Sequence, residues 1–169
     1  TLSYAYQADG LEKLPSLEDG DAVLTSVEVA EGDVVLKADD TVGPLAVGDV
    51  VNVSDGTEPV TFDGTPVMMD QMTADFTMLP TVWSDGTPVK ASDSVYSFNL
   101  VLDPDPPTVK YTAERTASYE ATGDLSVRWT GLPGFRNSTY SVAFWTPLPE
   151  HVLGAFSAAE LLEAEESSR

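Results

Sequence analysis

Short valine-rich runs, separated by acidic–glycine turns, dominate the first two thirds of the chain. The runs are Ala22–Val29, Val34–Lys37 and Asp49–Val53. The turns contain Glu18-Asp19-Gly20-Asp21, Glu31-Gly32-Asp33, Ala38-Asp39-Asp40, Val47-Gly48-Asp49, Ser54-Asp55-Gly56 and Phe62-Asp63-Gly64. β-Branched residues favour extended backbone, and acidic–glycine pairs favour the tight turns of hairpins. The spacing therefore predicts a meander of short antiparallel strands. None of these turns has the ligand spacing of an EF-hand loop.

The segment Met68–Leu79 has the clearest strand pattern, because its side chains alternate between apolar and polar. One predicted face is apolar and consists of Met68, Met72, Ala74, Phe76 and Met78. The other face is polar and consists of Gln71, Thr73, Asp75 and Thr77, while Asp70 interrupts the apolar face near its start. A methionine stripe at strand spacing indicates a hydrophobic core rather than a metal or heme site.

Residues 91–102 have the spacing of a helix. Their apolar stripe consists of Val95, Phe98 and Leu102. Ser92 and Asp93 lie in the first turn, where such residues cap a helix and favour its dipole. Asp103-Pro104 ends the helix, because proline disfavours helical backbone in the residue before it. The stretch Pro104-Asp105-Pro106-Pro107 is predicted to be a stiff loop.

The last third of the chain combines strands with a short helix. Strands are predicted over Lys110–Tyr119 and Asp124–Thr130, followed by a turn at Gly131-Leu132-Pro133-Gly134. Ser157-Ala158-Ala159-Glu160 is a capping box that opens a C-terminal helix through about Glu166. The predicted fold class is therefore α+β, mainly antiparallel β with a central helix and a short C-terminal helix.

Charge excludes some classes of partner. The chain has 8 Lys and Arg against 28 Asp and Glu, a net charge of -20. Such a field repels nucleic acids and anionic membrane surfaces. The acids are spread along the chain, which favours a solubility role over a specific cation site. There is no cysteine and no apolar run long enough to span a membrane. Because the chain starts at Thr1 and carries no signal peptide, we expect it to be cut from a longer protein.

The sequence offers no convergent catalytic set. His151 is the one histidine, so neither a paired-histidine zinc site nor a glycine-flanked nucleophile with its base is present. Phosphate-binding glycine loops are absent as well. We predict no catalytic residue, no metal site, no cofactor and no enzyme activity, and we expect His151 to lie on the surface at the start of a helix.

The most specific feature is the string from Trp83 to Phe98, which reads Trp-Ser-Asp-Gly-Thr-Pro-Val-Lys-Ala-Ser-Asp-Ser-Val-Tyr-Ser-Phe. Physically it is a strand end, an Asp-Gly turn, a proline that fixes the exit and a capped helix. We expect Val95 and Phe98 to pack beneath the strand that carries Trp83. The string is thus a folding unit, and none of its residues needs to contact a ligand.

This string resembles the signature of the extracellular solute-binding proteins of the peptide/nickel ABC-importer family. That pattern runs roughly Lys-Trp-Ser-Asp-Gly-Thr-Pro-Val-Thr-Ala-Asp-Asp-Val-Val-Tyr-Ser-Phe. The departures here are Val82, Lys90, Ser92 and Ser94. Lys90 replaces the threonine that caps the helix, which leaves Ser92 as the substitute cap. Further segments resemble the family: Leu14–Glu18, Ala74–Pro80, Tyr119–Val127 and Pro147–Leu153.

The resemblance implies a part of a periplasmic-binding-protein type 2 fold. Residues 1–130 would form a β-rich auxiliary domain with an insertion at about 30–68, and residues 131–169 would return toward the first lobe. The function implied is capture of a peptide or similar solute for the membrane permease of an ABC importer. The implied location is extracytoplasmic, as an anchored lipoprotein in full length. The family's charged ligand-anchoring residues mostly lie in other segments, so the ligand-binding residues of this chain stay unknown.

A stand-alone β-rich adhesion or carbohydrate-binding module is the alternative. Trp83, Trp129 and Trp145 would form its sugar platform, although two of the three lie in strand patterns that predict burial. Tyr140 and Trp145 are the candidate exposed aromatic residues near the return segment. A core position is the preferred prediction for both.

Overall fold

The computed structural model describes residues 8–56, 58–104 and 109–163. In chain order, the elements are β1 (Ala22–Val29), β2 (Val34–Leu36), β3 (Val42–Pro44), β4 (Val50–Val51), β5 (Val60–Thr61), β6 (Val67–Thr77), α1 (Ala91–Leu102), the 3-10 turn η1 (Ala113–Arg115), β7 (Thr116–Ala121), β8 (Ser126–Gly131), the 3-10 turn η2 (Tyr140–Val142), α2 (Glu150–Leu153) and α3 (Ala158–Glu163). The described strands form a four-stranded sheet in the order β1-β6-β8-β7 and two separate two-stranded pairs, β2-β3 and β4-β5.

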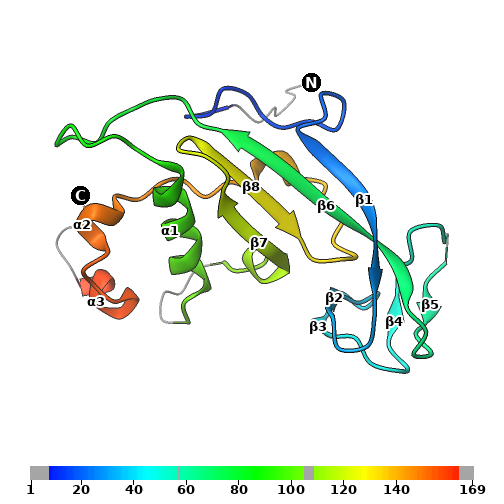
Figure 1. Ribbon diagram of the computed structural model, residues 1–169. Coiled ribbons are helices and arrows are strands. Elements are labelled where there is room, and N and C mark those ends of the chain that lie inside the picture. Colours follow the sequence, from blue (N-terminus) through cyan, green and yellow to red (C-terminus); the bar gives the residue numbers. More distant parts are fainter. Residues whose placement is uncertain (1–7, 57, 105–108, 164–169) are drawn as a thin grey trace, which may run out of the picture.

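All of these pairings are antiparallel, so the predicted α+β class with mainly antiparallel strands is confirmed. The helices α1 to α3 lie at one end of the molecule and the small strands β2 to β5 at the other (Figure 1). The long ribbon of β1 and β6 connects the two ends. The part of the chain that the structure describes contains no helix long and apolar enough to cross a membrane.

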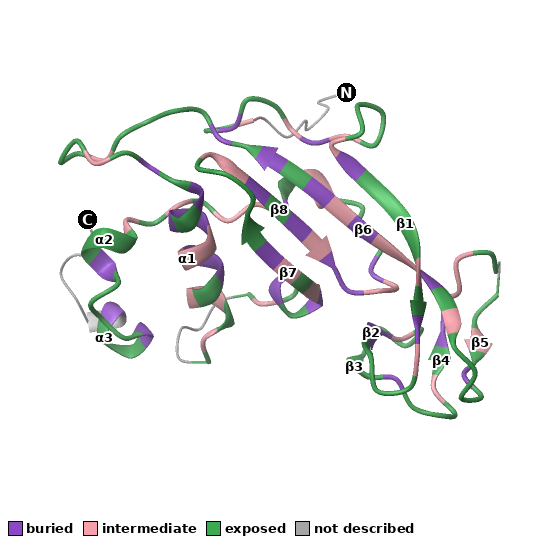
Figure 2. Cartoon of the chain, viewed as in Figure 1, coloured by how far each residue is buried: buried purple, intermediate pink, exposed green. Residues whose placement is uncertain are grey.

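The β1–β6 ribbon serves two hydrophobic cores, one on each of its faces. Near one end, Ala22 pairs with Ala74, and both side chains are buried in the core that faces α1. Near the other end, Val27 pairs with Met69 on the opposite face, against the small strands. Because alternate residues of a strand point to opposite faces, burial changes sides midway along β6. The alternation of buried and exposed bands is visible in Figure 2.

This change of side corrects the predicted apolar face of β6. Met72, Ala74, Phe76 and Met78 are buried on one face as predicted, but Met68 is 42% exposed. The buried methionine at that end is Met69, on the opposite face. The alternation of apolar and polar residues along the strand cannot predict this change of face. The small strands β2 to β5 cover the second face of β6 only through tertiary contacts.

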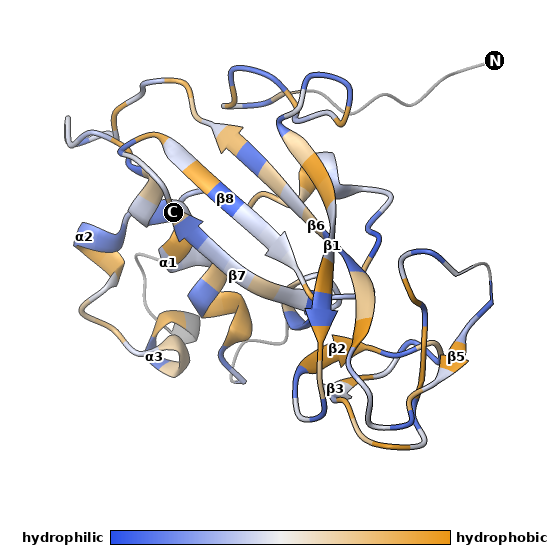
Figure 3. Ribbon diagram, turned by 45° about the vertical axis from the view of Figure 1, so that its right-hand side comes forward, coloured by the Kyte–Doolittle hydropathy of each residue, from blue (hydrophilic) through white to orange (hydrophobic). Residues whose placement is uncertain are grey.

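The second core lies among β2, β4 and the halves of β1 and β6 that adjoin these small strands. Its buried members are Val29, Val35, Leu45, Val51, Phe62 and Met69. Figure 3 shows hydrophobic stretches of β2 and β5 at this end of the molecule. Most of these residues fall within the predicted insertion, whose boundaries at about 30 and 68 stay a prediction.

Several acidic side chains stabilise the turns through hydrogen bonds to backbone N–H groups. Asp33 and Asp49 each accept a hydrogen bond at 2.8 Å from a backbone N–H three residues earlier, Ala30 and Ala46 respectively. Asp63 accepts one at 2.9 Å from the N–H of Thr65. This local bonding of carboxylates to backbone is why Asp is favoured in turns, and it lowers the pKa of Asp63.

The main core lies between the sheet and α1. Trp129 has no exposed surface, and Phe98 packs against Tyr119 with ring centroids 5.2 Å apart. The helix faces β7 and β8. Phe98, Val95 and Trp83 belong to the same core, and the predicted packing of the helix beneath the segment that carries Trp83 stays a prediction. Leu102, predicted in the apolar stripe, is 44% exposed. In its place α1 buries two serines, Ser94 and Ser97.

Of the other local predictions, some are confirmed and one is wrong in part. The bounds of α1 match the predicted 91–102, and the capping box at Ser157 is confirmed, because its hydroxyl accepts from the N–H of Glu160 and Glu160 accepts from the N–H of Ser157. The strand predicted over Lys110–Tyr119 is wrong in its first half, where a turn and η1 precede β7. The predictions for 105–107 and for 164–166 lie outside the described residues.

Candidate functional site

The string Trp83–Phe98 begins with a small hairpin. Val82 and Pro88 form an antiparallel bridge, and the N–H of Trp83 donates to the carbonyl of Thr87 at 2.8 Å. Gly86 has a φ of 87°, in the left-handed region that glycine adopts without steric cost. Asp85 accepts from the N–H of Thr87 at 2.8 Å. The Asp-Gly turn therefore forms where the sequence predicts it.

Asp93 is the hub of this site. It is only 6% exposed and lies in the first turn of α1. One carboxylate oxygen accepts from the N–H of Lys90 at 2.9 Å and from the indole N–H of Trp83 at 3.4 Å. The other accepts from the N–H of Glu150 at 3.3 Å. A single buried carboxylate thus joins the hairpin, the helix and α2.

The helix cap corrects one prediction. Lys90, not Ser92, occupies the N-cap position, with extended backbone. The cap hydrogen bond comes from the Asp93 side chain, which accepts from the Lys90 N–H. Asp93, which the sequence places in the first turn of the helix, therefore supplies the cap.

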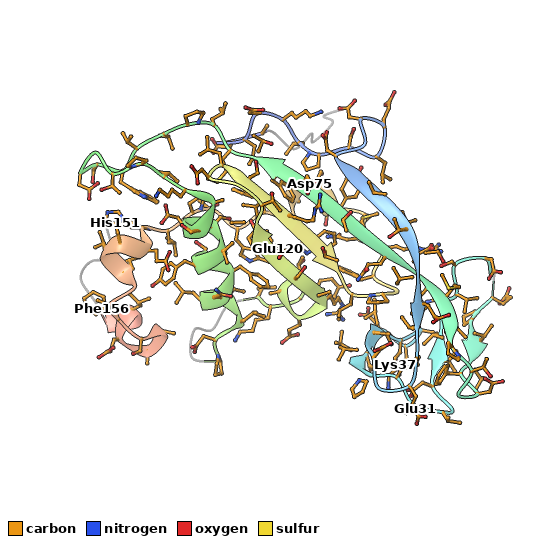
Figure 4. All side chains as sticks on the ribbon, viewed as in Figure 1. Glu31, Lys37, Asp75, Glu120, His151 and Phe156 are labelled. Atoms are coloured by element: carbon orange, nitrogen blue, oxygen red, sulfur yellow. The ribbon has the colours of Figure 1, made fainter. Side chains whose placement is uncertain are left out.

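His151 lies on the surface in the short helix α2, as predicted. Its Nε2 is 2.8 Å from an Asp85 carboxylate oxygen, and its ring centroid is 6.4 Å from that of Trp83. The pKa of Asp85 is lowered to about 2, chiefly by the hydrogen bond from the Thr87 N–H and then by His151. In Figure 4, His151 lies at the opposite end of the molecule from Lys37 and Glu31. Sequence reasoning did not find this pair, because 66 residues separate its members.

Buried hydroxyls fasten the return segment to α1. The Ser94 hydroxyl bonds the Tyr119 hydroxyl at 2.7 Å and donates to the carbonyl of Trp145. The Ser97 hydroxyl donates to the carbonyl of Thr146 at 2.7 Å. Burial raises the pKa of Tyr119 to about 12. These polar groups satisfy one another, so they hold the segment in place and leave few donors for a ligand.

The candidate aromatic residues pack against the core. Trp145 meets both Phe98 and Tyr119 edge-on, each with ring centroids 4.7 Å apart. Tyr140 packs partly buried against the main core, and its hydroxyl accepts from the N–H of Leu17 at 3.2 Å. The core positions predicted for Trp145 and Tyr140 are therefore what the structure contains.

A cavity of about 370 Å³ lies beside the hairpin, and its lining is mainly apolar. Hydrophobic side chains around it include Trp83, Met78, Leu79, Val82 and Phe144. Such a hollow accepts an apolar group, but no charged pair converges on it. Among the described residues there is also no cluster of three or more metal-ligating side chains.

Comparison with known proteins gives similarity to solved structures only. No family model matches the chain. The search of curated proteins also returns no match. The chain is similar to the oligopeptide-binding protein AppA of Bacillus subtilis in complex with a nonapeptide, with 21% identity over 81% of this chain and 25% of that chain, and a TM-score of 0.46. It is also similar to the oligopeptide-binding protein of Thermus thermophilus complexed with a pentapeptide, with 21% identity over 75% and 20% of the two chains, and a TM-score of 0.43.

A third similar structure is NikZ of Campylobacter jejuni in complex with Ni(L-His), with 16% identity over 78% of this chain and 24% of that chain, and a TM-score of 0.44. These similar structures are of binding proteins rather than enzymes. This chain spans about a quarter of the length of these proteins. The function proposed for this chain is therefore argued from its own residues.

Proposed function

We propose that this chain is a part of an extracytoplasmic solute-binding protein of the peptide/nickel type, the capture component of an ABC importer. The observation that carries the proposal is the string Trp83–Phe98, whose residues match the family signature in fixed register. In the fold, Gly86 makes the turn, and the bond between Trp83 and Asp93 locks that turn to the helix. These structural roles explain why the signature needs those residue types at that spacing.

Within that protein, we assign this chain a scaffold role. The polar groups of the site bond to one another: Asp93 to backbone N–H groups and Trp83, Ser94 and Ser97 to the return segment. A side chain already satisfied in this way gains little from a ligand. The contacts to a peptide or similar solute would then come from other parts of the full-length protein. The permease partner and the lipoprotein anchor belong to the same proposal.

The test is ligand binding by the full-length protein in which this chain occurs. Isothermal titration with a defined oligopeptide mixture, and separately with Ni²⁺ and L-histidine, is expected to give saturable binding of at least one of them. Absence of binding to both would contradict the proposed function. A sugar-binding module is disfavoured by one specific observation, because the ring of Trp129 is completely buried and cannot stack on a sugar.

A further inference from the structure

A second cavity, of about 390 Å³, lies far from the Trp83 hairpin, at the junction between the small strands and the sheet. Its lining combines opposite charges with aromatic rings. The lining residues that would contact a ligand are Asp40, Asp70, Arg136, Tyr111, Phe135 and Leu36. We propose that this cavity binds a free amino acid with an apolar side chain, through its carboxylate, its ammonium group and that side chain.

The walls of the cavity are fixed by backbone contacts. The N–H of Leu36 donates to the carbonyl of Pro133 at 2.9 Å, and the N–H of Gly134 donates to the carbonyl of Asp70 at 2.8 Å. Gly134 has a φ of 90°, and a Cβ there would lie 2.6 Å from the carbonyl oxygen of Leu36. The cavity is therefore formed between elements that are locked together, as small-molecule sites usually are.

One side of the cavity rests on a buried arginine. Arg115 is 8% exposed, and its terminal nitrogen donates at 3.0 Å both to the carbonyl and to the carboxylate of Asp40. Its guanidinium carbon lies 3.9 Å from the centroid of the Tyr111 ring. Its Nε has no hydrogen-bond partner among the described residues. Two lining residues, Asp40 and Tyr111, are thus held in place by a charge behind them.

Asp40 occupies a backbone conformation that glycine would adopt more easily. Its φ is 67°, the only positive value at a non-glycine residue in the described part of the chain. The left-handed conformation is sterically costly for residues with a Cβ. The pairing with Arg115 explains why a carboxylate stands here, yet the Asp40 side chain remains 60% exposed. It keeps capacity to accept hydrogen bonds from a cation.

The other side of the cavity carries the second ion pair. Arg136 contacts the carboxylate of Asp70, whose side chain is 12% exposed, while the Arg136 side chain is 54% exposed. A guanidinium has five N–H donors, and the contact with Asp70 uses only part of them. Arg136 can therefore bind a carboxylate in the bidentate manner typical of arginine.

The charge balance selects the ligand class. With Arg115 and Arg136 against Asp40 and Asp70, the site as a whole is neutral, in a chain of net charge -20. The exposed part of Arg136 offers N–H donors to a carboxylate, and the exposed part of Asp40 offers acceptors to an ammonium group. A simple anion or a simple cation would use one of these groups and be repelled by the other. A zwitterion satisfies both signs. Tyr111 and Phe135, with ring centroids 6.2 Å apart, and Leu36 offer apolar surface for a side chain.

The volume limits the size of the ligand. Ligand sites range from about 300 to 1,000 Å³, and 390 Å³ lies near the small end. One amino acid suits this space better than an oligopeptide. The site is thus independent of the peptide-capture function proposed above, and its test uses different ligands.

The experiment is an NMR titration of the 169-residue chain with L-phenylalanine and with L-leucine, up to tens of millimolar. We expect saturable shifts confined to the amides of the cavity, Tyr111 and Gly134 among them. N-acetyl-L-phenylalanine amide, which lacks both charges, should cause no such shifts. No saturable shift at the cavity with either amino acid would overturn the proposal.

Two matched variants test the role of Arg136. Arg136→Gln should weaken binding by about tenfold, roughly the value of one charge-assisted bidentate contact. Arg128→Gln is the control, because Arg128 forms a comparable exposed pair with Asp75 on the four-stranded sheet and does not line the cavity. Equal affinity of both variants for L-phenylalanine would contradict the site. Should Arg136→Gln fail to fold, Arg136→Lys provides a second test. Lysine keeps the positive charge but cannot bind a carboxylate in a bidentate manner, so this variant is expected to weaken binding several-fold.

Discussion

At the scale of single residues, the structure gives specific roles to charged side chains whose partners the sequence does not predict. Asp93 is the clearest case, because the pattern predicts only a favourable acid in a first helical turn. Its side chain is buried and accepts hydrogen bonds from Trp83, which precedes the helix in the chain, and from Glu150, which follows it. No periodicity in the sequence indicates that α2 returns to this point.

Replacing Asp93 should therefore cost far more stability than replacing an exposed acid. Asp93→Ala removes the helix cap and takes the acceptor away from the N–H groups of Lys90, Trp83 and Glu150, so we expect a loss of about 2–3 kcal/mol in the free energy of unfolding. Asp75→Ala, at an exposed pair with Arg128, should cost about 1 kcal/mol or less. Urea unfolding followed by circular dichroism measures both. Similar losses in the two variants would contradict the role given to Asp93.

The stability of the chain should also depend on pH in the acid range, through Asp85 in the hairpin. The pKa of Asp85 is about 2 in the folded chain against an ordinary value of 3.8. Since the folded value is lowered, the ionised carboxylate stabilises the fold above about pH 4, and this contribution is lost as pH falls toward 2. Asp85→Asn should flatten that part of the stability profile.

The causes of the lowered pKa can be separated. The backbone bond from Thr87 ranks above His151, so His151→Gln should keep most of the acid dependence. Unfolding midpoints measured between about pH 5 and pH 2 provide the comparison. If His151→Gln removed the dependence as fully as Asp85→Asn, the histidine would be the dominant partner and the assignment would be wrong.

At the scale of elements, sequence patterns predicted what is local and missed what depends on tertiary contact. The strand Ala22–Val29 and the helix 91–102 have their predicted bounds, because propensity, caps and proline act within a few residues. The sequence pattern predicts that Met68 is buried, whereas Met69 is the buried residue, because the two ends of β6 contribute to two different cores. Leu102 was misplaced for a similar reason: α1 buries serine hydroxyls against the return segment instead.

The candidate sites were still less predictable. His151 was correctly expected at the surface, but its pairing with Asp85 depends on how α2 packs. The second cavity brings together Asp40, Asp70 and Arg136 from three separate segments. Neither grouping leaves a spacing signal in the sequence, because each is made by the fold.

Two glycines distinguish backbone strain from close packing. Gly86 and Gly134 have similar positive φ values, 87° and 90°. A Cβ at Gly86 would meet nothing within 4 Å, whereas at Gly134 it would lie 2.6 Å from the Leu36 carbonyl. Gly86→Ala should thus cost about 1–2 kcal/mol from strain alone. Gly134→Ala should cost about 2 kcal/mol more, because the turn must move off β2. Chemical denaturation of both variants checks this order, and a reversed order would contradict the packing described.

At the scale of the whole molecule, the long β1–β6 ribbon joins two cores into one body, with acids spread over its turns. Some of the acidic side chains bond locally to backbone N–H groups, as at Asp33 and Asp49. The remainder keeps the surface strongly anionic, which favours solubility and disfavours nucleic acid as a partner.

Tryptophan accessibility separates the scaffold role from the carbohydrate-binding alternative. Trp129 is fully buried, and Trp83 and Trp145 pack partly buried against the main core. Acrylamide quenching should leave one of the three tryptophans inaccessible, and Trp129→Phe should remove that unquenched emission. Three fully quenchable tryptophans would instead favour an exposed aromatic platform.

A scaffold within a solute-binding protein should not capture solute without the rest of that protein. Calorimetric titration of the 169-residue chain with an oligopeptide library and with Ni²⁺, beside the full-length protein under the same conditions, measures this dependence. We predict saturable binding by the full-length protein and no micromolar binding by the chain alone. Micromolar binding of a peptide or Ni²⁺ by the chain alone would contradict the scaffold role.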